Sequence, residues 1–406
     1  MKRIHYGWFV LLGCALLLFC TSGLCVNAFT IYQPCILSHN QFTNAQSSLI
    51  VTTRSLAAFL SMFLTGAYYR RLSLRSGMSA AGLVTAGGFV LFGLAESFPH
   101  YCLAAVLTGF GFGVGSMIPI AIVLEHWFHR KRTLAISLCS AVTGLSTLGI
   151  PNLLTWMIER WSLRATFLAE GAFVALLSLL TFLLVRDEPA RKHMEAYGAG
   201  ASSGGSAARQ PGRSLQRKNW HLLVPMLLAI GAKTGTGYSH LAVLASSQGF
   251  DSHVTALAIS VSGVMMTLAK CAYGWITERV GMYRSNRIFG GVLMAGMLLC
   301  CLVGLGPAVL FAAMCCYGGG LAMTTAGLSA WAGELSSSAD YDRTVRRFQI
   351  GYAAGGLLFS SLPGILADLS GGSYIPAYIF FAVCTAFVIF AIQRTLRRSA
   401  PAGAKN

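Results

Sequence analysis

The sequence has few charged residues and very few acidic ones. Of its 406 residues, 11% are charged and 55% are hydrophobic, and 13 Asp and Glu stand against 30 Lys and Arg. An ordinary soluble domain carries about 25% charged residues. This shortage of charge excludes a water-soluble domain of the usual kind and indicates a chain whose main solvent is lipid.

The sequence also lacks the short motifs of enzyme active sites and metal centres. Its 12 cysteines include no CxxC pair, and nearly all of them lie in apolar stretches, where small packing residues are expected. There is no metal-ligand cluster or nucleophile elbow, and the glycine-rich run Gly109–Gly115 lacks the Lys-Ser/Thr of a phosphate-binding loop. We therefore expect no metal, no cofactor, no disulfide and no enzymatic activity.

Long apolar stretches, by contrast, recur from end to end. Each has roughly 20 residues, enough to cross a hydrocarbon core of about 30 Å as a helix. We count twelve, at residues 8–33, 47–69, 78–97, 101–124, 133–157, 164–185, 220–246, 253–276, 286–305, 307–331, 348–369 and 374–393. The first is too long for the apolar region of a signal peptide, about 7–15 residues, and we expect it to be retained as a helix.

The net charge of +17 could indicate a nucleic-acid partner, but the basic residues alternate with the apolar stretches. They lie in every second loop, as at Arg70–Arg75 and Arg130–Arg132, whereas the opposite loops carry little beyond Arg160 and Arg164. By the positive-inside rule this pattern predicts a multi-pass protein of the cell inner (plasma) membrane with both termini in the cytoplasm. Lipid, and not nucleic acid, is the expected partner.

One long polar stretch divides the chain into halves. Residues 186–219 are rich in Gly, Ser, Ala and Arg, which predicts a flexible cytoplasmic linker. It separates a six-helix bundle over residues 1–185 from a second over 220–406. The halves share features: Gly66–Arg75 corresponds to Gly274–Arg284, 208 residues later, and glycine runs occur in the fourth and tenth apolar stretches. Such duplication is common in transporters.

The second copy, Gly274-Trp-Ile-Thr-Glu278-Arg279-Val-Gly281-Met-Tyr-Arg284, resembles the signature G-x-x-x-[DE]-R-x-G-x-x-[RK] of the major facilitator superfamily. In the first copy Arg70 replaces the acid and Ser73 replaces the second glycine. Three further motifs resemble the oxalate/formate-antiporter-like and monocarboxylate-porter branch, namely Tyr6-Gly7-Trp8, Trp127-Phe128-His129-Arg130-Lys131-Arg132 and Arg186-Asp187-Glu188-Pro189.

This resemblance covers nearly the whole chain. It implies an all-α membrane protein with twelve transmembrane helices in two pseudo-symmetric six-helix bundles, which rock about a site between them. The resemblance also implies a cytoplasmic gate at the second copy, formed by Gly274, Glu278, Arg279, Gly281 and Arg284. There the charged side chains would bond neighbouring helix ends, and Gly274 would allow close helix approach.

The charges within the apolar stretches are unbalanced. Arg54, Lys233 and Lys270 lie inside them, but only Glu170 among the acids does. An ionisable group deep in a bilayer costs about 2.5–3.5 kcal/mol on insertion scales, so each should face a cavity or a partner. The surplus of cations predicts a positively charged cavity for a small organic anion such as a carboxylate.

Each cation has a second interpretation. Arg54 could hold a carboxylate bidentately, or it could cap a backbone carbonyl or pair with Glu170. Lys233 lies in a glycine-interrupted stretch typical of midplane binding sites, which could also be a hinge. Lys270 lies four residues before Gly274, where porters of this branch resemble one another in having a basic residue, usually arginine, that binds the carboxylate.

Other polar residues within the apolar stretches are candidates for supporting roles. Asn27, Tyr32 and Tyr317 are candidates to line the substrate cavity by hydrogen bonding. Glu170 is a candidate for proton coupling, with a solvated position near the interface as the alternative. His240 could act as a proton relay or lie at the interface.

The predicted function is transport of a small organic anion by alternating access. Because an anion entering a negative cell works against about 2.3 kcal/mol per 100 mV, we expect exchange with a counter-anion or symport with a proton. Two alternatives stay open. One is efflux of a lipophilic or neutral solute, and the other is a non-transporting membrane sensor on the same fold.

Overall fold

The computed structural model describes residues 5–42, 44–146, 150–192, 194–198, 220–337 and 339–399. Almost all of the described residues are helical. The β-structure in these ranges is limited to an isolated bridge between Phe128 and Tyr197. The chain divides into two compact units, one of Met1–Ala135 and Val142–Ser206, the other of Ile136–Ala141 and Ala207–Asn406.

The first six predicted spans correspond to the helices up to α9. The first span runs through α1 (Gly7–Leu18), the π-helix η1 (Phe19–Ala28) and α2 (Phe29–Asn40). Then follow α3 (Asn44–Arg71), α4 (Leu74–Leu94), α5 (Phe98–Gly115), α6 (Met117–Trp127), α7 (Arg132–Leu145), α8 (Ile150–Arg160) and α9 (Leu163–Leu184), with a short 3-10 helix, η2 (Pro189–Lys192), after them. Thus the fourth span is α5 with α6, and the fifth is α7 with α8.

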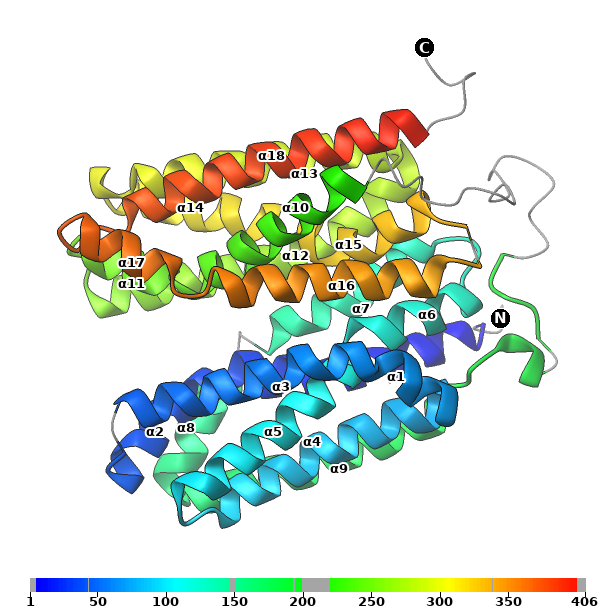
Figure 1. Ribbon diagram of the computed structural model, residues 1–406, viewed down its shortest axis with the longest axis horizontal. Helices are drawn as coiled ribbons and strands as arrows, with labels where there is room; N and C mark the ends of the chain where they lie inside the picture. The colour runs from blue at the N-terminus through cyan, green and yellow to red at the C-terminus, as the bar shows by residue number, and fades with distance from the viewer. Residues whose placement is uncertain are drawn as a thin grey trace. The chain divides into compact units, whose positions relative to one another are not determined.

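The second half repeats this order, as the colours of Figure 1 allow the reader to follow. The elements are α10 (Trp220–Gly231), the π-helix η5 (Ala232–Gly237), α11 (Leu241–Ser247), α12 (Ser252–Val280), α13 (Met282–Cys301), the 3-10 helix η6 (Val303–Leu305), α14 (Pro307–Gly320), α15 (Ala322–Leu335), α16 (Tyr341–Leu358), α17 (Leu362–Leu369) and α18 (Ile375–Ser399). The seventh span is therefore divided into α10, η5 and α11.

Nine helices in the described ranges are long and apolar enough to cross a membrane. The fifth, seventh and ninth predicted spans are not among these nine helices. The fifth is divided between α7 and α8, Lys233 with its glycines and threonines interrupts the seventh, and α13 carries Arg284 and Arg287 near its start. Together the segments form the expected twelve-span all-α architecture, so the predicted fold class is confirmed.

Glycines bring the central helix of each unit close to two neighbours. A Cβ on Gly109 of α5 would lie 2.3 Å from the carbonyl oxygen of Arg54 on α3, and one on Gly111 would lie 2.6 Å from that of Ala81 on α4. On α14 the corresponding distances are 2.3 Å from Gly318 to the Ser262 oxygen on α12 and 2.4 Å from Gly320 to Leu293 on α13. Helix packing therefore explains both glycine runs.

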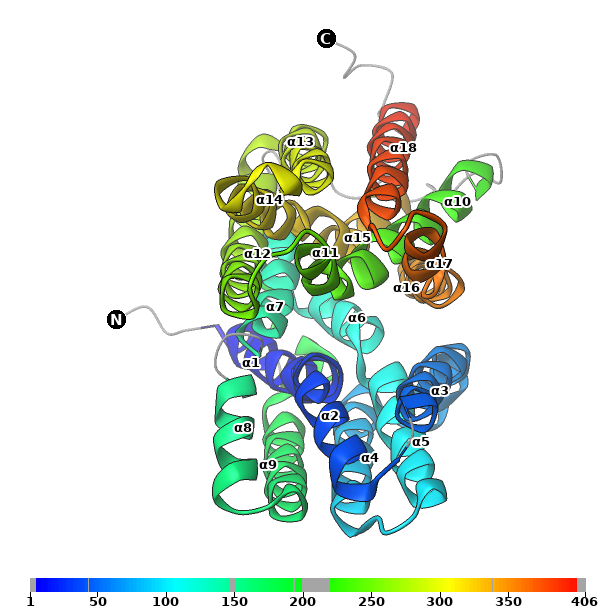
Figure 2. The ribbon, with the colours of Figure 1, turned by 90° about the vertical axis from the view of Figure 1, so that its left-hand side faces the viewer.

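Each unit buries its own apolar core and leaves large aliphatic side chains exposed on its helices. Phe92, Tyr101 and Phe167 belong to the core of the first unit, and Tyr317 and Tyr378 to that of the second. Leu183 on α9 and Val383 on α18 are 58% and 64% exposed. Exposed apolar residues on long helices are what a lipid solvent allows. Figure 2 shows many of these helices nearly end-on.

The first part of the predicted linker is folded against the first unit, which the expectation of a flexible segment did not foresee. The amide of Tyr197 donates to the carbonyl of Trp127 at 2.8 Å, and its own carbonyl accepts from the amide of Arg130 at 3.0 Å. The Tyr197 ring packs edge-on against His5 and Trp8. Residues 199–219 lie outside the described part of the chain, so the domain boundaries stay a prediction.

Candidate functional site

Arg54, the candidate cation of the first unit, is 7% exposed on α3. Its Nη1 donates to the carbonyl oxygen of Cys25 at 2.7 Å, and its guanidinium carbon lies 4.4 Å from the centre of the Phe29 ring. The alternative ion pair with Glu170 is not formed: within the described ranges the one ion pair joins Arg132 to Glu125. The guanidinium is instead held by a carbonyl and an aromatic face.

Glu170 is buried on α9, with 5% exposure, and is not solvated at the interface. Its Oε2 accepts a hydrogen bond from the Tyr32 hydroxyl, which comes from α2. Its Oε1 has no hydrogen-bond partner among the described residues. The structure therefore pairs two residues that the sequence suggested separately, one as a cavity wall and the other as a coupling group.

Lys233 lies in the π-helix η5 and is completely buried. Its Nζ has no hydrogen-bond partner within the described part of the chain. The backbone around it is held by two tyrosines. The Tyr317 hydroxyl donates to the carbonyl of Lys233 at 2.7 Å, and the Tyr378 hydroxyl donates to the carbonyl of Gly237 at 2.8 Å. Tyr317 thus acts on the predicted site through the backbone of η5.

Lys270 is 3% exposed on α12. Its Nζ donates to the carbonyl oxygen of Ser140 at 3.3 Å. Ser140 belongs to Ile136–Ala141, the stretch of α7 that groups with the second unit.

The predicted gate lies at the turn between α12 and α13. Gly281 has φ of +85°, a backbone conformation that glycine adopts without strain, and this explains its place in the motif. Gly274 is buried in α12, whereas Glu278 and Arg284 are exposed. The Arg279 guanidinium carbon lies 3.8 Å from the centre of the Trp275 ring. Latching by these residues stays a prediction.

The first copy of the motif, at the turn between α3 and α4, has a different structure from the second. Ser73 has φ of −61° and accepts a hydrogen bond from the Ser76 amide at 3.2 Å, so it caps α4 where the second copy needs a glycine. Asp187, from the loop after α9, accepts from the Arg75 amide at 2.6 Å. The start of α4 is therefore bonded to a carboxylate, that of Asp187, which lies outside the motif.

Two other predicted residues, Asn27 and His240, lie in or next to the π-helices. Asn27 is in η1, but its side chain lies outside the described part of the structure. The Nδ1 of His240 lies 2.8 Å from the carbonyl oxygen of Thr236, and its ring lies 6.1 Å from that of Tyr374. His240 thus contacts the backbone at the end of η5.

Sequence reasoning missed a buried polar cluster near the predicted gate. The Oδ1 of Asn286 on α13 accepts from the Tyr273 hydroxyl at 2.9 Å and from the Trp331 indole at 3.1 Å. Its Nδ2 has no partner in the described ranges. A signal was available, because Asn286 is an amide at the start of an otherwise apolar stretch.

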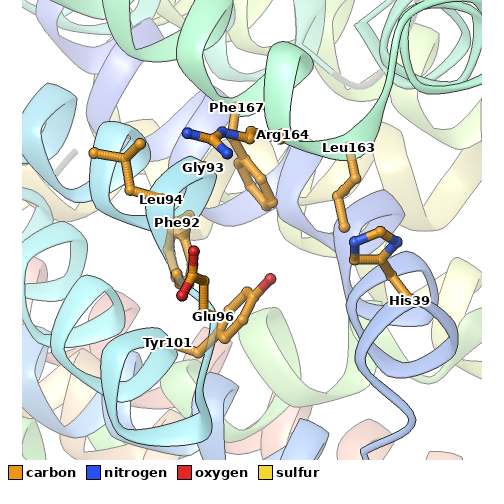
Figure 3. A pocket seen from close by; sticks show the side chains of 10 residues that line it. His39, Phe92, Gly93, Leu94, Glu96, Tyr101, Leu163, Arg164 and Phe167 are labelled. Atoms are coloured by element: carbon orange, nitrogen blue, oxygen red, sulfur yellow. The ribbon is translucent and has the colours of Figure 1, made fainter.

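A cavity of about 140 Å³ opens in the first unit, and its lining includes none of the predicted cations Arg54, Lys233 and Lys270 (Figure 3). His39, Glu96 and Arg164 bring charge or titratable groups to it, and Phe92, Tyr101 and Phe167 form an aromatic wall. Sequence reasoning did not foresee this cavity. Within the described residues, no group of three or more His, Cys, Asp or Glu could hold a metal ion.

Helical spans long enough to cross a membrane, with buried charges inside them, define a multi-pass membrane protein. The sequence matches the description "Major Facilitator Superfamily" over residues 14–339. The chain therefore belongs to the major facilitator superfamily, as its motifs suggested.

Among curated proteins, the chain is 25% identical to mouse monocarboxylate transporter 12 over 326 residues, 73% of this chain and 66% of that protein. It is 26% identical to mouse monocarboxylate transporter 11 over 410 residues, 95% of this chain and 85% of that protein. The match to monocarboxylate transporter 12 thus spans just under two thirds of that relative's length.

Two solved structures share the fold. A variant of the E. coli fucose:proton symporter FucP superposes with a TM-score of 0.72 at 17% identity, covering 97% of this chain and 98% of that one. The human organic anion transporter MFSD10 superposes with a TM-score of 0.71 at 15% identity, covering 95% of this chain and 98% of that one.

Proposed function

We propose that this transporter carries a small organic anion, a mono- or dicarboxylate, across the cell inner (plasma) membrane by alternating access, as anion exchange or proton symport. One observation carries the proposal: the buried cations Arg54, Lys233 and Lys270 outnumber Glu170, the one buried acid in the described spans. Buried charge in a membrane protein is costly and tends to mark the path of a substrate.

The argument that buried cations mark a site for an anion is strongest for Lys233. Its ammonium is fully buried and lacks a hydrogen-bond partner among the described residues. A buried cation without a counter-charge is stabilised when an anion arrives. Names among the similar proteins agree with this chemistry, since the curated relatives are monocarboxylate transporters and one structural neighbour is an organic anion transporter.

We also propose that Glu278, Arg279 and Arg284 stabilise one orientation of the transporter from the cytoplasmic side. The support is their exposure at the α12–α13 turn and the match of this turn to the superfamily signature. Exposed charges at helix ends can form and break ion pairs at little cost, which suits a contact that must open in every cycle.

The test is uptake of labelled mono- and dicarboxylates into proteoliposomes, with and without an internal anion and with an imposed pH gradient. Uptake that needs the internal anion means exchange, and uptake driven by the gradient means proton symport. We expect Lys270→Gln to abolish anion uptake and Lys270→Arg to retain part of it, because only the latter keeps a cation.

Arg287→Gln is the matched control, since it removes an exposed cation from α13. It should leave uptake at the wild-type rate. If no carboxylate moves under either condition, the proposal is wrong, and efflux of a neutral solute or a sensor role becomes the better interpretation. Unchanged uptake in Lys270→Gln would remove Lys270 from the site.

A further inference from the structure

We propose that the Tyr32–Glu170 pair is the proton-carrying site of this transporter and that protons reach it from the aromatic-walled cavity of the first unit. This inference rests on the proposed function, and it selects proton symport as the mode of transport. It concerns α2, α9 and the helices packed on them, all within one unit.

The first step of the argument is the state of the Glu170 carboxyl. It is 95% buried, by its 5% exposure, and it lies in a span that must cross lipid. One oxygen accepts from the Tyr32 hydroxyl, and the other has no partner among the described residues. A carboxylate with one hydrogen bond and no cation is costly to bury, whereas a bound proton removes the charge and adds a donor.

The second step is the absence of a counter-charge from the elements packed on α9. Within the described residues, the helices α1, α4 and α8 and the π-helix η1 contact α9. Their titratable groups, with those of α2 and of α9 itself, are Cys14, Cys20, Cys25, Cys35, His39, Arg75, Glu159, Arg160 and Arg164. The thiols of Cys20 and Cys25 are the ones near enough to interact with Glu170, besides Tyr32.

The cations among these groups are engaged elsewhere. Arg75 packs against Phe182 at the other end of α9, with 3.8 Å between its guanidinium carbon and the ring centre. Arg160 at the end of α8 and Arg164 at the start of α9 are exposed. The guanidinium on α3, that of Arg54, is bonded to a carbonyl of η1. The charge of Glu170 is therefore not neutralised by a described cation, and a mobile proton is the remaining way to neutralise it.

The third step is access. Phe167 lies one helical turn before Glu170 and lines the cavity. Its ring stacks on that of Tyr32, with centroids 4.1 Å apart, and on that of Phe92, with centroids 5.3 Å apart. The Phe167 ring thus both lines the cavity and contacts Tyr32. Figure 3 shows Phe167 among the cavity residues, with Glu96, Arg164 and His39 nearby.

The chemistry is a simple proton transfer. A proton from cavity water forms an O–H bond with the Glu170 carboxylate, which leaves a hydroxide that bulk buffer neutralises. After reorientation, the O–H bond breaks and the proton passes to water on the other side. One proton carried with one monoanion makes the cycle electroneutral, which removes the work of about 2.3 kcal/mol per 100 mV against the membrane potential.

The experiment compares two assays on the full chain in proteoliposomes, using a labelled carboxylate that the wild type transports. The first is exchange of external label for internal unlabelled carboxylate without a gradient. The second is accumulation driven by an imposed gradient of about one pH unit, which supports about tenfold accumulation at a one-to-one ratio. Internal pyranine fluorescence reports proton entry with substrate.

We expect Glu170→Gln to lose gradient-driven accumulation and pyranine quenching while it continues to exchange label. The amide cannot bind a proton for transport, but it fits the same space. Glu159→Gln is the matched control, because Glu159 is an exposed carboxylate in the same unit. It should behave as the wild type in both assays.

The outcomes separate the two proposals. Wild-type exchange without any response to the pH gradient, or full accumulation by Glu170→Gln, overturns the proton site and leaves anion transport standing. No wild-type flux in either assay overturns anion transport and the proton site with it.

A second variant decides the matter if Glu170→Gln is inactive in both assays. Tyr32→Phe keeps the ring stack on Phe167 but removes the hydroxyl that bonds Glu170. It should shift the pH dependence of gradient-driven uptake relative to the wild type, because the carboxyl loses its one hydrogen bond. An unchanged pH profile would contradict the proposal.

Discussion

At the scale of single residues, Lys233 shows a conflict between stability and function. Its ammonium is fully buried and unpartnered in the described structure, so it should lower the stability of the second unit. Replacing a buried charge that has no partner with an apolar residue of similar length removes the cost of burying that charge and should raise stability. Because a buried lysine without a partner lowers stability, binding of a ligand explains Lys233 better than helix packing does.

We predict that Lys233→Met raises the thermal unfolding midpoint of the detergent-purified protein and lowers carboxylate uptake by roughly tenfold or more. Unfolding can be followed by the loss of a monodisperse chromatography peak after heating, and uptake can be measured in proteoliposomes. Arg287→Met, at an exposed position, should change neither quantity. A stabilised variant with normal uptake would mean that Lys233 is a structural residue.

The sequence identifies single buried charges better than their partners. Arg54, Glu170, Lys233 and Lys270 stand out because each is an ionisable residue in an apolar stretch, and the structure buries all four. The Tyr32–Glu170 bond joins residues 138 positions apart. The spacing of residues in the sequence does not indicate which tyrosine bonds Glu170, because this depends on how α2 packs near α9.

At the scale of helices, spacing explains what the sequence could predict. Apolar length located the spans, and the glycine runs of the fourth and tenth stretches were visible in the sequence. The glycines of α5 point alternately to two neighbours, since Gly109 and Gly113 meet α3 while Gly111 meets α4. The π-helices η1 and η5 were not predicted, because their register depends on tertiary contacts such as the tyrosine bonds to η5.

We predict that Gly113→Val destabilises the first unit. Its Cβ would lie 2.3 Å from the carbonyl oxygen of Ala58, and such overpacking costs about 1–3 kcal/mol. The measurement is the thermal unfolding midpoint together with the yield of monodisperse protein.

Gly87→Val on α4 is the matched control, because a Cβ there would meet nothing within 4 Å. It should leave the midpoint near that of the wild type. If both variants have the same unfolding midpoint, the α3–α5 contact is looser than the structure shows. The two glycines would then affect stability through helix propensity alone.

At the scale of the whole molecule, the two halves repeat an architecture but not every contact. In the second half the α12–α13 turn needs Gly281 at positive φ, whereas in the first half Ser73 caps α4 in an extended conformation. The carboxylates also differ in position: Asp187 accepts from the Arg75 amide at the start of α4, whereas Glu278 lies in the last turn of α12. The two halves thus place their carboxylates on opposite sides of the corresponding turn, and a motif search finds only the second copy complete.

The orientation of the whole chain in the membrane is predicted from its charges and can be tested directly. Basic residues gather in alternate loops, with Arg70, Arg71 and Arg75 at one end of α3 and α4 and Arg394 and Arg397 at the end of α18. The positive-inside rule places these loops in the cytoplasm. We predict that a green fluorescent protein fused after α18 fluoresces and that alkaline phosphatase fused there is inactive.

The same fusions made after α4, near Ser97, should give the opposite result, because this loop carries no Lys or Arg. Activity of alkaline phosphatase at both positions would contradict the odd number of spans expected between them. Reversed results at both positions would place the Glu278 turn on the outside of the cell. The cavity walled by Phe92 and Phe167 would then open toward the cytoplasm, and protons would enter Glu170 from within.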